Sequence, residues 1–296
     1  MRILNRNIRS AIRVKMLRKF YFGFFAVILA VPAHSQEIGL QLYSLRNQMA
    51  EDLPNALQTI DDWDIHAVEG GGNLYGQSLT GFKALLDKHH IQIVSVDTNY
   101  KEVRDNPLAI AYKAQFYGAR FATFYWIPHD NGKPFTIEAA KQAVDVMNAA
   151  GAVLKANGVT LQYHPHGYEF SAHEDVTILD YMLKNVTEAK FQMDVFWIKQ
   201  GGQDPVDFLR RYPGKFTSLH MKDRKPGTAN TSNGQADIEV GIVLGAGDVG
   251  IESVVTEANR QGIKYFFIED ESSRVLQQVP KSIDYLKTLD GQEVGL

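Results

Sequence analysis

Eight short, β-rich apolar segments alternate with helical patterns along the chain, and this alternation constrains the fold more than any other feature. The segments are 37–44, 65–71, 91–98, 121–127, 160–165, 191–197, 216–223 and 265–271. Between them, apolar residues recur at three- and four-residue spacings, as in 52–63, 79–90, 109–119, 136–158 and 175–185. Eight strand–helix units predict a single α/β domain folded as a (β/α)8 TIM barrel. An open doubly wound sheet would need fewer strands or a second domain.

The N-terminal 35 residues have the pattern of a secretory signal peptide. They contain seven Lys or Arg residues and no acid, then the 14-residue apolar run 20–33, and end at Ser35. The run is shorter than the ~20 residues that span a bilayer, which disfavours a permanent membrane anchor. Because Met16 begins a conventional leader by itself, residues 1–15 are interpreted as a start-site extension. We therefore expect an exported, periplasmic protein whose mature chain, 36–296, is one barrel domain.

Net charge and cysteine content exclude some classes of partner and of functional site. Removing the seven basic residues of the leader from the 31 in the chain leaves 24 against 34 acids, a formal net charge of −10. Such a surface repels phosphate backbones, so nucleic acid is disfavoured as a partner. The chain has no cysteine, which excludes disulfides, thiolate metal sites and cysteine nucleophiles. The mature length is close to the ~250 residues of one α/β barrel. Homo-oligomers are compatible with such a fold, but the sequence does not specify one.

The stretch after the seventh expected strand, 225–241, has few apolar residues and is predicted to form a long active-site loop. It leads to GAGDVG at 245–250, which matches the G-x-G-x-x-G pattern of dinucleotide-binding turns. The match starts only about 50 residues before the end of the chain, so no room remains for the sheet that such a fold requires after it. We interpret 245–250 as a loop that closes over a sugar.

Unusual polar residues gather in the C-terminal halves of the last four expected strands. In a barrel, these strand ends and the loops after them carry the chemistry. From the fifth strand to the eighth they are His164 and His166, then Asp194, then His220 and Lys222, then Glu269 and Glu271. Two-residue spacing keeps both members of the last two pairs on one strand face, so each pair can point into the same barrel mouth.

A divalent metal site is the favoured interpretation of these residues. Charged side chains inside apolar strands are costly to bury unless they are paired or bind metal. Asp194 alone could be a buried cap or a salt-bridge partner, but His220 and Glu269 lie at matching depth on the next two strands. Two imidazoles and two carboxylates suit one ion of Mn, Co or Zn, with open positions for substrate oxygens. Either His164 or His166 would be the fourth ligand.

Together these residues resemble the sugar phosphate isomerase/epimerase superfamily, whose members have a xylose-isomerase-like barrel and are related to endonuclease IV (AP endonuclease family 2). The resemblance covers the whole mature chain. It is most specific in YHPHGYEF (163–170), 193–223 and FFIEDES (266–272), with GLQLYSLR (39–46) in support. It implies a divalent metal held by ligands from strands five to eight. Matched position by position, these ligands are His164, Asp194, His220 and Glu269.

The fifth strand departs from one branch of the superfamily. Ketose 3-epimerases have a glutamate there that binds metal and moves a proton, whereas this chain has His164. Inosose dehydratases similarly show a Tyr-His-x-His pattern. The missing carboxylate disfavours two-base epimerisation and favours dehydration or β-elimination, for which one base and a departing hydroxyl or alkoxide suffice.

The remaining roles follow from the implied removal of a proton next to a metal-bound carbonyl. His166 is the predicted base, because its ordinary pKa suits proton transfer near neutrality; a strand-end carboxylate, Glu69 or Glu271, is the alternative. Lys222 would stabilise the developing enolate. The predicted substrate-binding residues are Tyr43, Glu69, Trp126 and Trp197. Aromatic residues of a barrel also serve as packing, and His129 follows the fourth strand on the same side.

Export makes a phosphorylated sugar a poor candidate substrate and favours a keto sugar or 3-keto glycoside, by analogy with superfamily members that cleave such compounds. Three other functions stay open. The first is a true isomerase or epimerase of a free ketose. The second is a non-catalytic periplasmic carbohydrate-binding barrel, against which the retained metal ligands argue. The third is a nuclease, which the charge of −10 disfavours.

Overall fold

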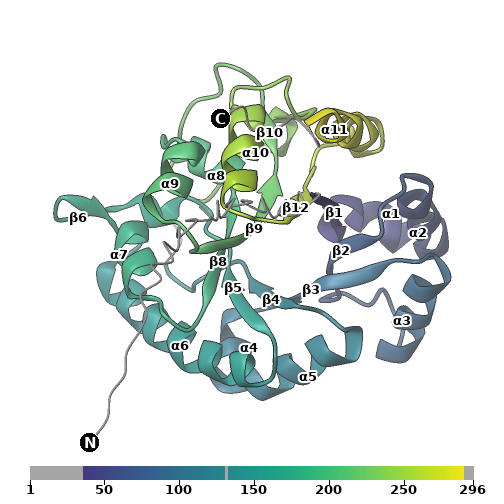
Figure 1. Ribbon diagram of the computed structural model, residues 1–296, viewed down its shortest axis with the longest axis horizontal. Helices are drawn as coiled ribbons and strands as arrows, with labels where there is room; N and C mark the ends of the chain where they lie inside the picture. The colour runs from purple at the N-terminus through teal and green to yellow at the C-terminus, as the bar shows by residue number, and fades with distance from the viewer. Residues whose placement is uncertain (1–35, 131–132, 290–296) are drawn as a thin grey trace, which may run out of the picture. The chain divides into compact units, whose positions relative to one another are not determined.

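The computed structural model describes residues 36–130 and 133–289, and the expected signal peptide lies outside the described residues. Eight strands form a closed barrel in the order β1-β12-β9-β8-β5-β4-β3-β2, and every neighbouring pair is parallel (Figure 1). The barrel strands are β1 (Glu37–Gln41), β2 (Ala67–Gly70), β3 (Gln92–Thr98), β4 (Phe121–Phe124), β5 (Thr160–Tyr163), β8 (Lys190–Asp194), β9 (Phe216–Met221) and β12 (Tyr265–Ile268). Each expected segment coincides with one of them, apart from Lys190, which precedes the sixth segment, and this confirms the predicted TIM barrel.

Helices lie around the strands (Figure 1). They are α1 (Arg46–Glu51), α2 (Leu53–Asp62), α3 (Leu79–Lys88), α4 (Tyr100–Asp105), α5 (Pro107–Tyr117), α6 (Ile137–Ala156), α7 (Ile178–Asn185), α8 (Val195–Gln200), α9 (Pro205–Arg211), α10 (Ile251–Arg260) and α11 (Val275–Leu289). Local sequence sets their ends. In α5, for example, the Asn106 side chain accepts a hydrogen bond from the Ala109 amide at the start, and Gly118 ends the helix at φ 70°. Within 36–130 and 133–289, no helix is long and apolar enough to cross a bilayer.

The sixth expected strand ends earlier than its apolar sequence predicts. The segment 191–197 leaves the barrel at Asp194, and α8 begins at Val195. The cause is Asp194 itself, whose Oδ1 accepts hydrogen bonds from the amides of Phe196 (2.8 Å) and Trp197 (3.2 Å). An N-cap of this kind satisfies amides that a continuing strand would have paired with β9.

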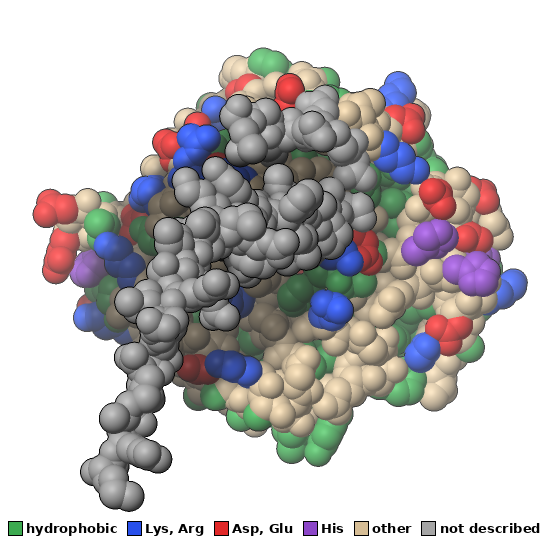
Figure 2. Space-filling model, viewed as in Figure 1, with side chains coloured by type: hydrophobic (Ala, Val, Ile, Leu, Met, Phe, Trp, Pro, Cys, Tyr) green, Lys and Arg blue, Asp and Glu red, His purple; other side chains and the backbone are tan. Residues whose placement is uncertain are grey.

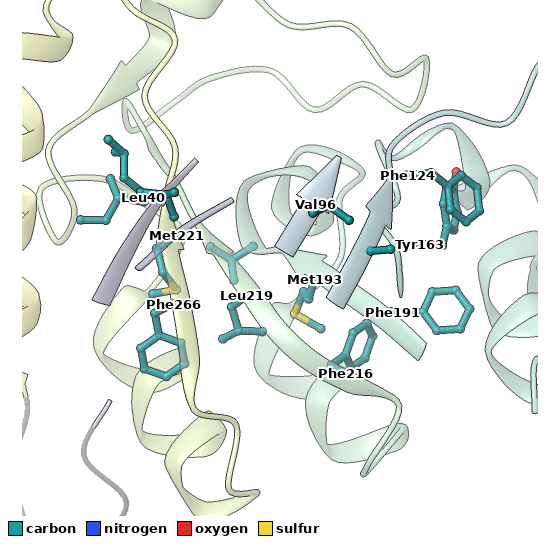
Figure 3. Close-up of a cluster of buried hydrophobic side chains, with 14 of the residues drawn as sticks. Leu40, Val96, Phe124, Tyr163, Phe191, Met193, Phe216, Leu219, Met221 and Phe266 are labelled. Carbon is teal, nitrogen blue, oxygen red and sulfur yellow. The ribbon is translucent and has the colours of Figure 1, made fainter. Parts of the chain in front are cut away.

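Alternate strand residues point outward and are apolar. They pack against the helices in one large buried cluster, of which Figure 3 labels Leu40, Phe124, Met193 and Phe266. The opposite strand positions point into the barrel. At the end of the barrel where the strands begin, these inward positions are apolar as well. A second cluster there is formed by Ala67, Val94, Phe121, Tyr265 and Phe267.

Between this cluster and the C-terminal ends of the strands, the barrel interior is polar. Seven strands contribute hydrogen-bonding side chains that are at most 3 % exposed: Gln41, Glu69, Ser95, Thr123, Gln162, Gln192 and Ser218. Their hydrogen bonds include Ser95–Thr123 (2.8 Å), Thr123–Gln162 (2.9 Å), Gln162–Ser218 (3.0 Å), Gln192–Ser218 (3.0 Å), Gln192–Glu69 (2.9 Å) and Gln41–Glu69 (3.0 Å). This connected layer supports the residues at the strand ends above it.

Four short strands, in two antiparallel pairs, belong to the loops after the barrel strands. β6 (Ala172–His173) and β7 (Val176–Thr177) make a hairpin after β5, and β10 (Asp223–Arg224) pairs with β11 (Gly241–Ile242) on either side of the loop 225–241. On the face seen in Figure 2, acidic and basic side chains are interspersed wherever grey atoms do not hide them, and the visible described surface has no continuous basic area.

Candidate active site

A cavity of about 630 Å³ opens where the barrel strands end. The strands and the segments directly after them contribute Gln41, Tyr43, Asp97, Thr98, Tyr125, His164, His166, Phe196, Trp197, Lys222, Glu269 and Glu271. The loop 225–241 completes the wall with Gly234, Gln235, Ala236, Asp237, Ile238, Val240 and Gly241. Seven of the eleven predicted site residues therefore line one cavity, together with the loop 225–241, which was predicted to be an active-site loop.

Three of the four predicted metal ligands lie together at the base of this cavity. His164, Asp194 and His220 each offer a ligand atom within 4.8 Å of the others, and all three side chains are buried. The fourth predicted ligand, Glu269, contacts one member of the cluster: its Oε2 lies 3.3 Å from His220 Nδ1. Asp194 and His220 belong to β8 and β9, and His164 and Glu269 directly follow β5 and β12; these four strands are neighbours in the barrel.

Two buried atoms of the cluster have no hydrogen-bond partner. His164 Nδ1 lies 2.9 Å from Gln192 Oε1, which only accepts, so Nδ1 carries the proton and Nε2 presents a lone pair. That Nε2 and Asp194 Oδ2 are 3.6 Å apart and are both unsatisfied. Two unpaired electron-pair donors facing each other in a buried site fit a bound cation, so the residues present suit a divalent metal.

His220 sits between two carboxylates. Its Nε2 contacts Glu69 Oε1 at 2.6 Å, and its Nδ1 faces Glu269. Burial alone would lower the pKa of His220, but Glu69 and then Glu269 outweigh it and raise the pKa to about 10. The two carboxylates therefore favour a positive charge at this position, which a bound cation would supply after the imidazole has lost its proton. Glu69, fixed in turn by Gln41 and Gln192, also orients the imidazole, as carboxylates behind metal-binding histidines do.

Lys222 is the cation that faces the cavity. It is 5 % exposed, forms an ion pair with Glu271, and has its Nζ 3.9 Å from Glu269 Oε2. Burial disfavours its charge, but Glu269 and Glu271 outweigh burial and raise the pKa of Lys222 above its ordinary value. Its ammonium group lies 5.0 Å from the centroid of the Phe196 ring. A lysine held this way stays charged and cannot itself serve as a base near neutral pH.

His166 borders the same cavity two residues after His164. Its Nδ1 lies 3.3 Å from the His164 carbonyl oxygen, so this nitrogen donates and Nε2 is left as an acceptor. Burial, followed by the neighbouring His164, lowers the pKa of His166 to about 3. The imidazole is therefore neutral at physiological pH, and it contacts the rings of Trp126 and Trp197 at centroid distances of 5.9 and 5.4 Å.

The four predicted substrate-binding residues separate into two pairs. Tyr43, 53 % exposed, and Trp197 line the cavity. Glu69 is fully buried beneath it against His220, and Trp126 packs on His129 and Tyr168 without lining the cavity.

Sequence reasoning missed Asp97, at the end of β3, as a cavity residue. The Tyr125 hydroxyl donates a hydrogen bond to Asp97 Oδ1 at 2.6 Å. Burial, and then repulsion from Glu69, raises the pKa of Asp97 to about 6. The signal was present, because Asp97 is an acid at the end of an apolar strand, as Asp194 is.

The glycine-rich turn 245–250 holds a carboxylate of this same chain. The amides of Gly245 (3.0 Å), Gly247 (3.1 Å) and Val249 (3.2 Å) all donate to Asp223. A Cβ atom at Gly247 would overlap the Asp223 carboxylate and the Arg224 carbonyl. The turn thus uses the amide geometry of an anion-binding loop, but its anion is Asp223, which follows Lys222. No residue of 245–250 lines the cavity, so the turn does not have the predicted place over a sugar there.

Comparisons with known proteins agree with this architecture. Residues 57–289 match the family model of the xylose isomerase-like TIM barrel, so the chain belongs to that family. A sugar phosphate isomerase/epimerase from Parabacteroides distasonis is 25 % identical with a TM-score of 0.68, over 85 % of this chain and 98 % of that one. No curated protein sequence matches.

Two more distant structures share the fold. A probable 3-DHS dehydratase from Bacillus anthracis is 13 % identical with a TM-score of 0.64, over 85 % of this chain and 99 % of that one. A D-allulose 3-epimerase from a Methylomonas species, solved with D-allulose, is 11 % identical with a TM-score of 0.64, over 86 % of this chain and 97 % of that one. At these identities, the two structures show that the barrel fold is shared.

Proposed function

We propose that this chain is a divalent-metal-dependent enzyme that removes a proton next to the carbonyl of a keto sugar or 3-keto glycoside. The observation that carries the proposal is the unsatisfied pair His164 Nε2 and Asp194 Oδ2, 3.6 Å apart beside His220 at the base of the cavity. With Glu269, these residues would hold one Mn, Co or Zn ion. A bound ion would polarise the substrate carbonyl and so acidify the adjacent C–H bond.

The side chains around the cavity support the proton transfer. His166 is neutral and presents Nε2 as an acceptor, so it can take up a proton. Its pKa of about 3 makes it a weaker base than the ordinary pKa, on which the prediction rested, would make it. Lys222, held by Glu271, supplies a fixed positive charge for the developing enolate oxygen. Asp97, with its pKa near 6, lines the same cavity and can return a proton to a departing oxygen.

We infer that elimination or dehydration is favoured over epimerisation. Two-base epimerisation needs a second base at the fifth strand, and His164 at that position presents its one lone pair to the metal cluster. Elimination needs one base and a donor for the leaving oxygen, which His166 and Asp97 supply. The likeness to a D-allulose 3-epimerase favours the alternative, a true isomerase or epimerase of a free ketose. A non-catalytic sugar-binding barrel is the second alternative.

Export to the periplasm remains part of the proposal. The basic, then apolar leader ending at Ser35 supports it. A small-molecule sugar or glycoside outside the cytoplasm would be non-phosphorylated, in keeping with a cavity whose one lining lysine, Lys222, is already paired with Glu271.

The first test is elemental analysis of the purified mature protein. We expect about one divalent ion per chain in the wild type and a loss of it in Asp194→Ala and His220→Ala, because each variant removes one of few ligands. The matched control is His89→Ala, a buried histidine beside Asp61 and away from the cavity, which should keep the ion. A wild type that stays metal-free after incubation with Mn, Co and Zn would leave the sugar-binding barrel as the better reading.

The second test is turnover in deuterated water. A 3-keto glycoside should release its aglycone, and a ketose should exchange deuterium next to its carbonyl without stereochemical inversion. Stereochemical inversion of a ketose without aglycone release from the glycoside would establish the epimerase alternative instead.

A further inference from the structure

The wall of the active-site cavity includes two exposed, largely apolar side chains. Tyr43 is 53 % exposed and Ile238 is 41 % exposed, and both line the cavity. Most large hydrophobic side chains within 36–130 and 133–289 are buried, and the other exposed ones, such as Tyr112 and Leu276, do not line it. Scattered exposed apolar residues are ordinary, but two of them in the wall of one cavity indicate a ligand that covers them.

The Tyr43 ring is held in place with part of its surface free. The Arg46 guanidinium lies over the ring, 4.3 Å from its centroid, and donates hydrogen bonds to the carbonyl oxygens of Tyr43 (3.0 Å) and Glu271 (3.3 Å). Arg46 therefore covers one face of the ring. Because the side chain is still half exposed and lines the cavity, its other side is open to a ligand.

The residue that follows Ile238 anchors it. Ile238 begins the 3₁₀ helix Ile238–Val240, and the middle residue, Glu239, accepts a hydrogen bond from the Ser273 amide at 2.8 Å and forms an ion pair with Arg274. Glu239 thus ties the helix to the segment after β12, while Ile238 and Val240 on either side of it line the cavity. An isoleucine on a backbone anchored in this way stays at the cavity wall instead of turning away from water.

The two side chains are attached to the same segment of the chain. Tyr43 is joined through Arg46 to Glu271, and Ile238 is joined through Glu239 to Ser273, two residues further on. Tyr43 and Ile238 therefore lie on the same side of the cavity, next to the segment after β12, and one ligand group can contact both.

The cavity changes in character from its base to its exposed part. At the base lie the buried cluster His164, Asp194 and His220 and the ion pair of Lys222 with Glu271. A keto sugar bound by its oxygens at the base would direct the group attached to its C1 atom towards the exposed part. Lys222 is the one lysine or arginine among the described lining residues, and it is already paired, so an acidic group there would gain no partner. A flat apolar group would stack on Tyr43 and cover Ile238.

We propose that Tyr43 and Ile238 form a subsite for an aromatic aglycone, so that the substrate class of this enzyme is a 3-keto glycoside whose leaving group carries an aromatic ring. This proposal rests on the proposed function. The base takes the proton at C2, a C1–C2 double bond forms, and the C1–O bond breaks with its electron pair. The departing oxygen takes up a proton, and the aglycone leaves as a phenol or an aromatic alcohol.

The kinetic test compares a benzyl 3-keto glycoside with the corresponding methyl 3-keto glycoside. Both leaving groups are primary alkoxides, so the comparison measures binding of the ring and not the ease of departure. The wild type should have a kcat/KM about tenfold higher for the benzyl glycoside, since stacking and burial of one ring contribute about that factor. Tyr43→Ala should bring the benzyl-to-methyl ratio of kcat/KM close to one.

Three further variants show whether the ring and the isoleucine act as proposed. Tyr43→Phe keeps the ring and should keep the wild-type ratio. Ile238→Thr keeps the branched shape but is more polar, so it should lower the ratio by about threefold. Tyr112→Ala is the matched control, because Tyr112 is an exposed tyrosine on α5 that does not line the cavity; its ratio should equal that of the wild type.

A binding measurement separates failure of the subsite from failure of the chemistry. The unoxidised benzyl and methyl glycosides are titrated into the wild type, Tyr43→Ala and Tyr112→Ala by calorimetry. Tighter binding of the benzyl glycoside that is lost only in Tyr43→Ala, with no turnover of either keto glycoside, keeps the subsite and overturns the proposed reaction. Turnover of both keto glycosides with equal kcat/KM in the wild type overturns the subsite and leaves the reaction standing. Neither binding nor turnover overturns both.

Discussion

Glu169 shows at the scale of one residue how this chain positions its histidines. The side chain is fully buried, and its oxygens accept hydrogen bonds from the amides of His166 (3.2 Å) and Gly167 (2.9 Å) and from the Tyr163 hydroxyl. Burial outweighs these bonds and raises the pKa of Glu169 to about 7. The residue holds the turn that carries His164 and His166, so we regard it as a positioning residue.

Glu169→Ala should therefore weaken metal binding without removing a ligand. Two buried amides lose their acceptor, at about 1–3 kcal/mol each. We expect the affinity for a divalent ion to fall about 10–100-fold, the usual effect of losing a partner behind the ligands. Chelator competition and thermal unfolding measure the two effects. Glu169→Gln keeps an accepting oxygen and should restore most of the affinity. An alanine variant with wild-type affinity would show that other contacts hold the turn.

At the scale of elements, Asp223 joins β10 to the glycine-rich turn before α10. Its carboxylate accepts four backbone amides, from Arg224, Gly245, Gly247 and Val249. Asp223→Asn has one accepting oxygen, so at least some of these amides lose their partner, which costs about 2–4 kcal/mol. We expect the Tm to fall by about 5–10 °C, and amide exchange at 245–249 to accelerate.

The control for this prediction is Asp237→Asn. Asp237 caps a 3₁₀ helix, Ile238–Val240, by accepting the Glu239 amide at 2.9 Å. Asparagine is as good an N-cap as aspartate, so this variant should unfold at the wild-type temperature. If Asp223→Asn does the same, the turn does not depend on the carboxylate.

At the scale of the whole molecule, Glu257 makes the folding stability depend on pH in the acid range. Located on α10, it accepts hydrogen bonds from Arg260 and Gln261 on the same side and from Arg210 of α9 at 3.1 Å. The bonds from Arg260, against the opposing effect of burial, lower the pKa of Glu257 to about 2. A carboxyl with a depressed folded-state pKa stabilises the fold above its ordinary pKa of about 4.3 and loses that contribution as the pH falls.

We expect Glu257 to contribute about 1–2 kcal/mol to the free energy of unfolding at neutral pH, discounted because both arginine partners are largely exposed. Between about pH 4.3 and 2 this contribution should disappear. Glu257→Gln should therefore flatten the pH dependence of urea unfolding in that range, whereas Glu252→Gln, at an exposed position of the same helix, should follow the wild type. Parallel curves for Glu257→Gln and the wild type would contradict the assignment.

The sequence by itself determined the barrel, because strand and helix periodicities are local signals and eight repeats of them close in one common way. It also placed His164, Asp194, His220 and Glu269 at adjacent strand ends, since neighbouring parallel strands end on the same face. Only the tertiary structure decided which side chains meet across the barrel. Glu69 lies under His220, 151 positions away, while Trp126 turns towards His129. Such contacts depend on register, strand tilt and rotamer, and no local pattern encodes them.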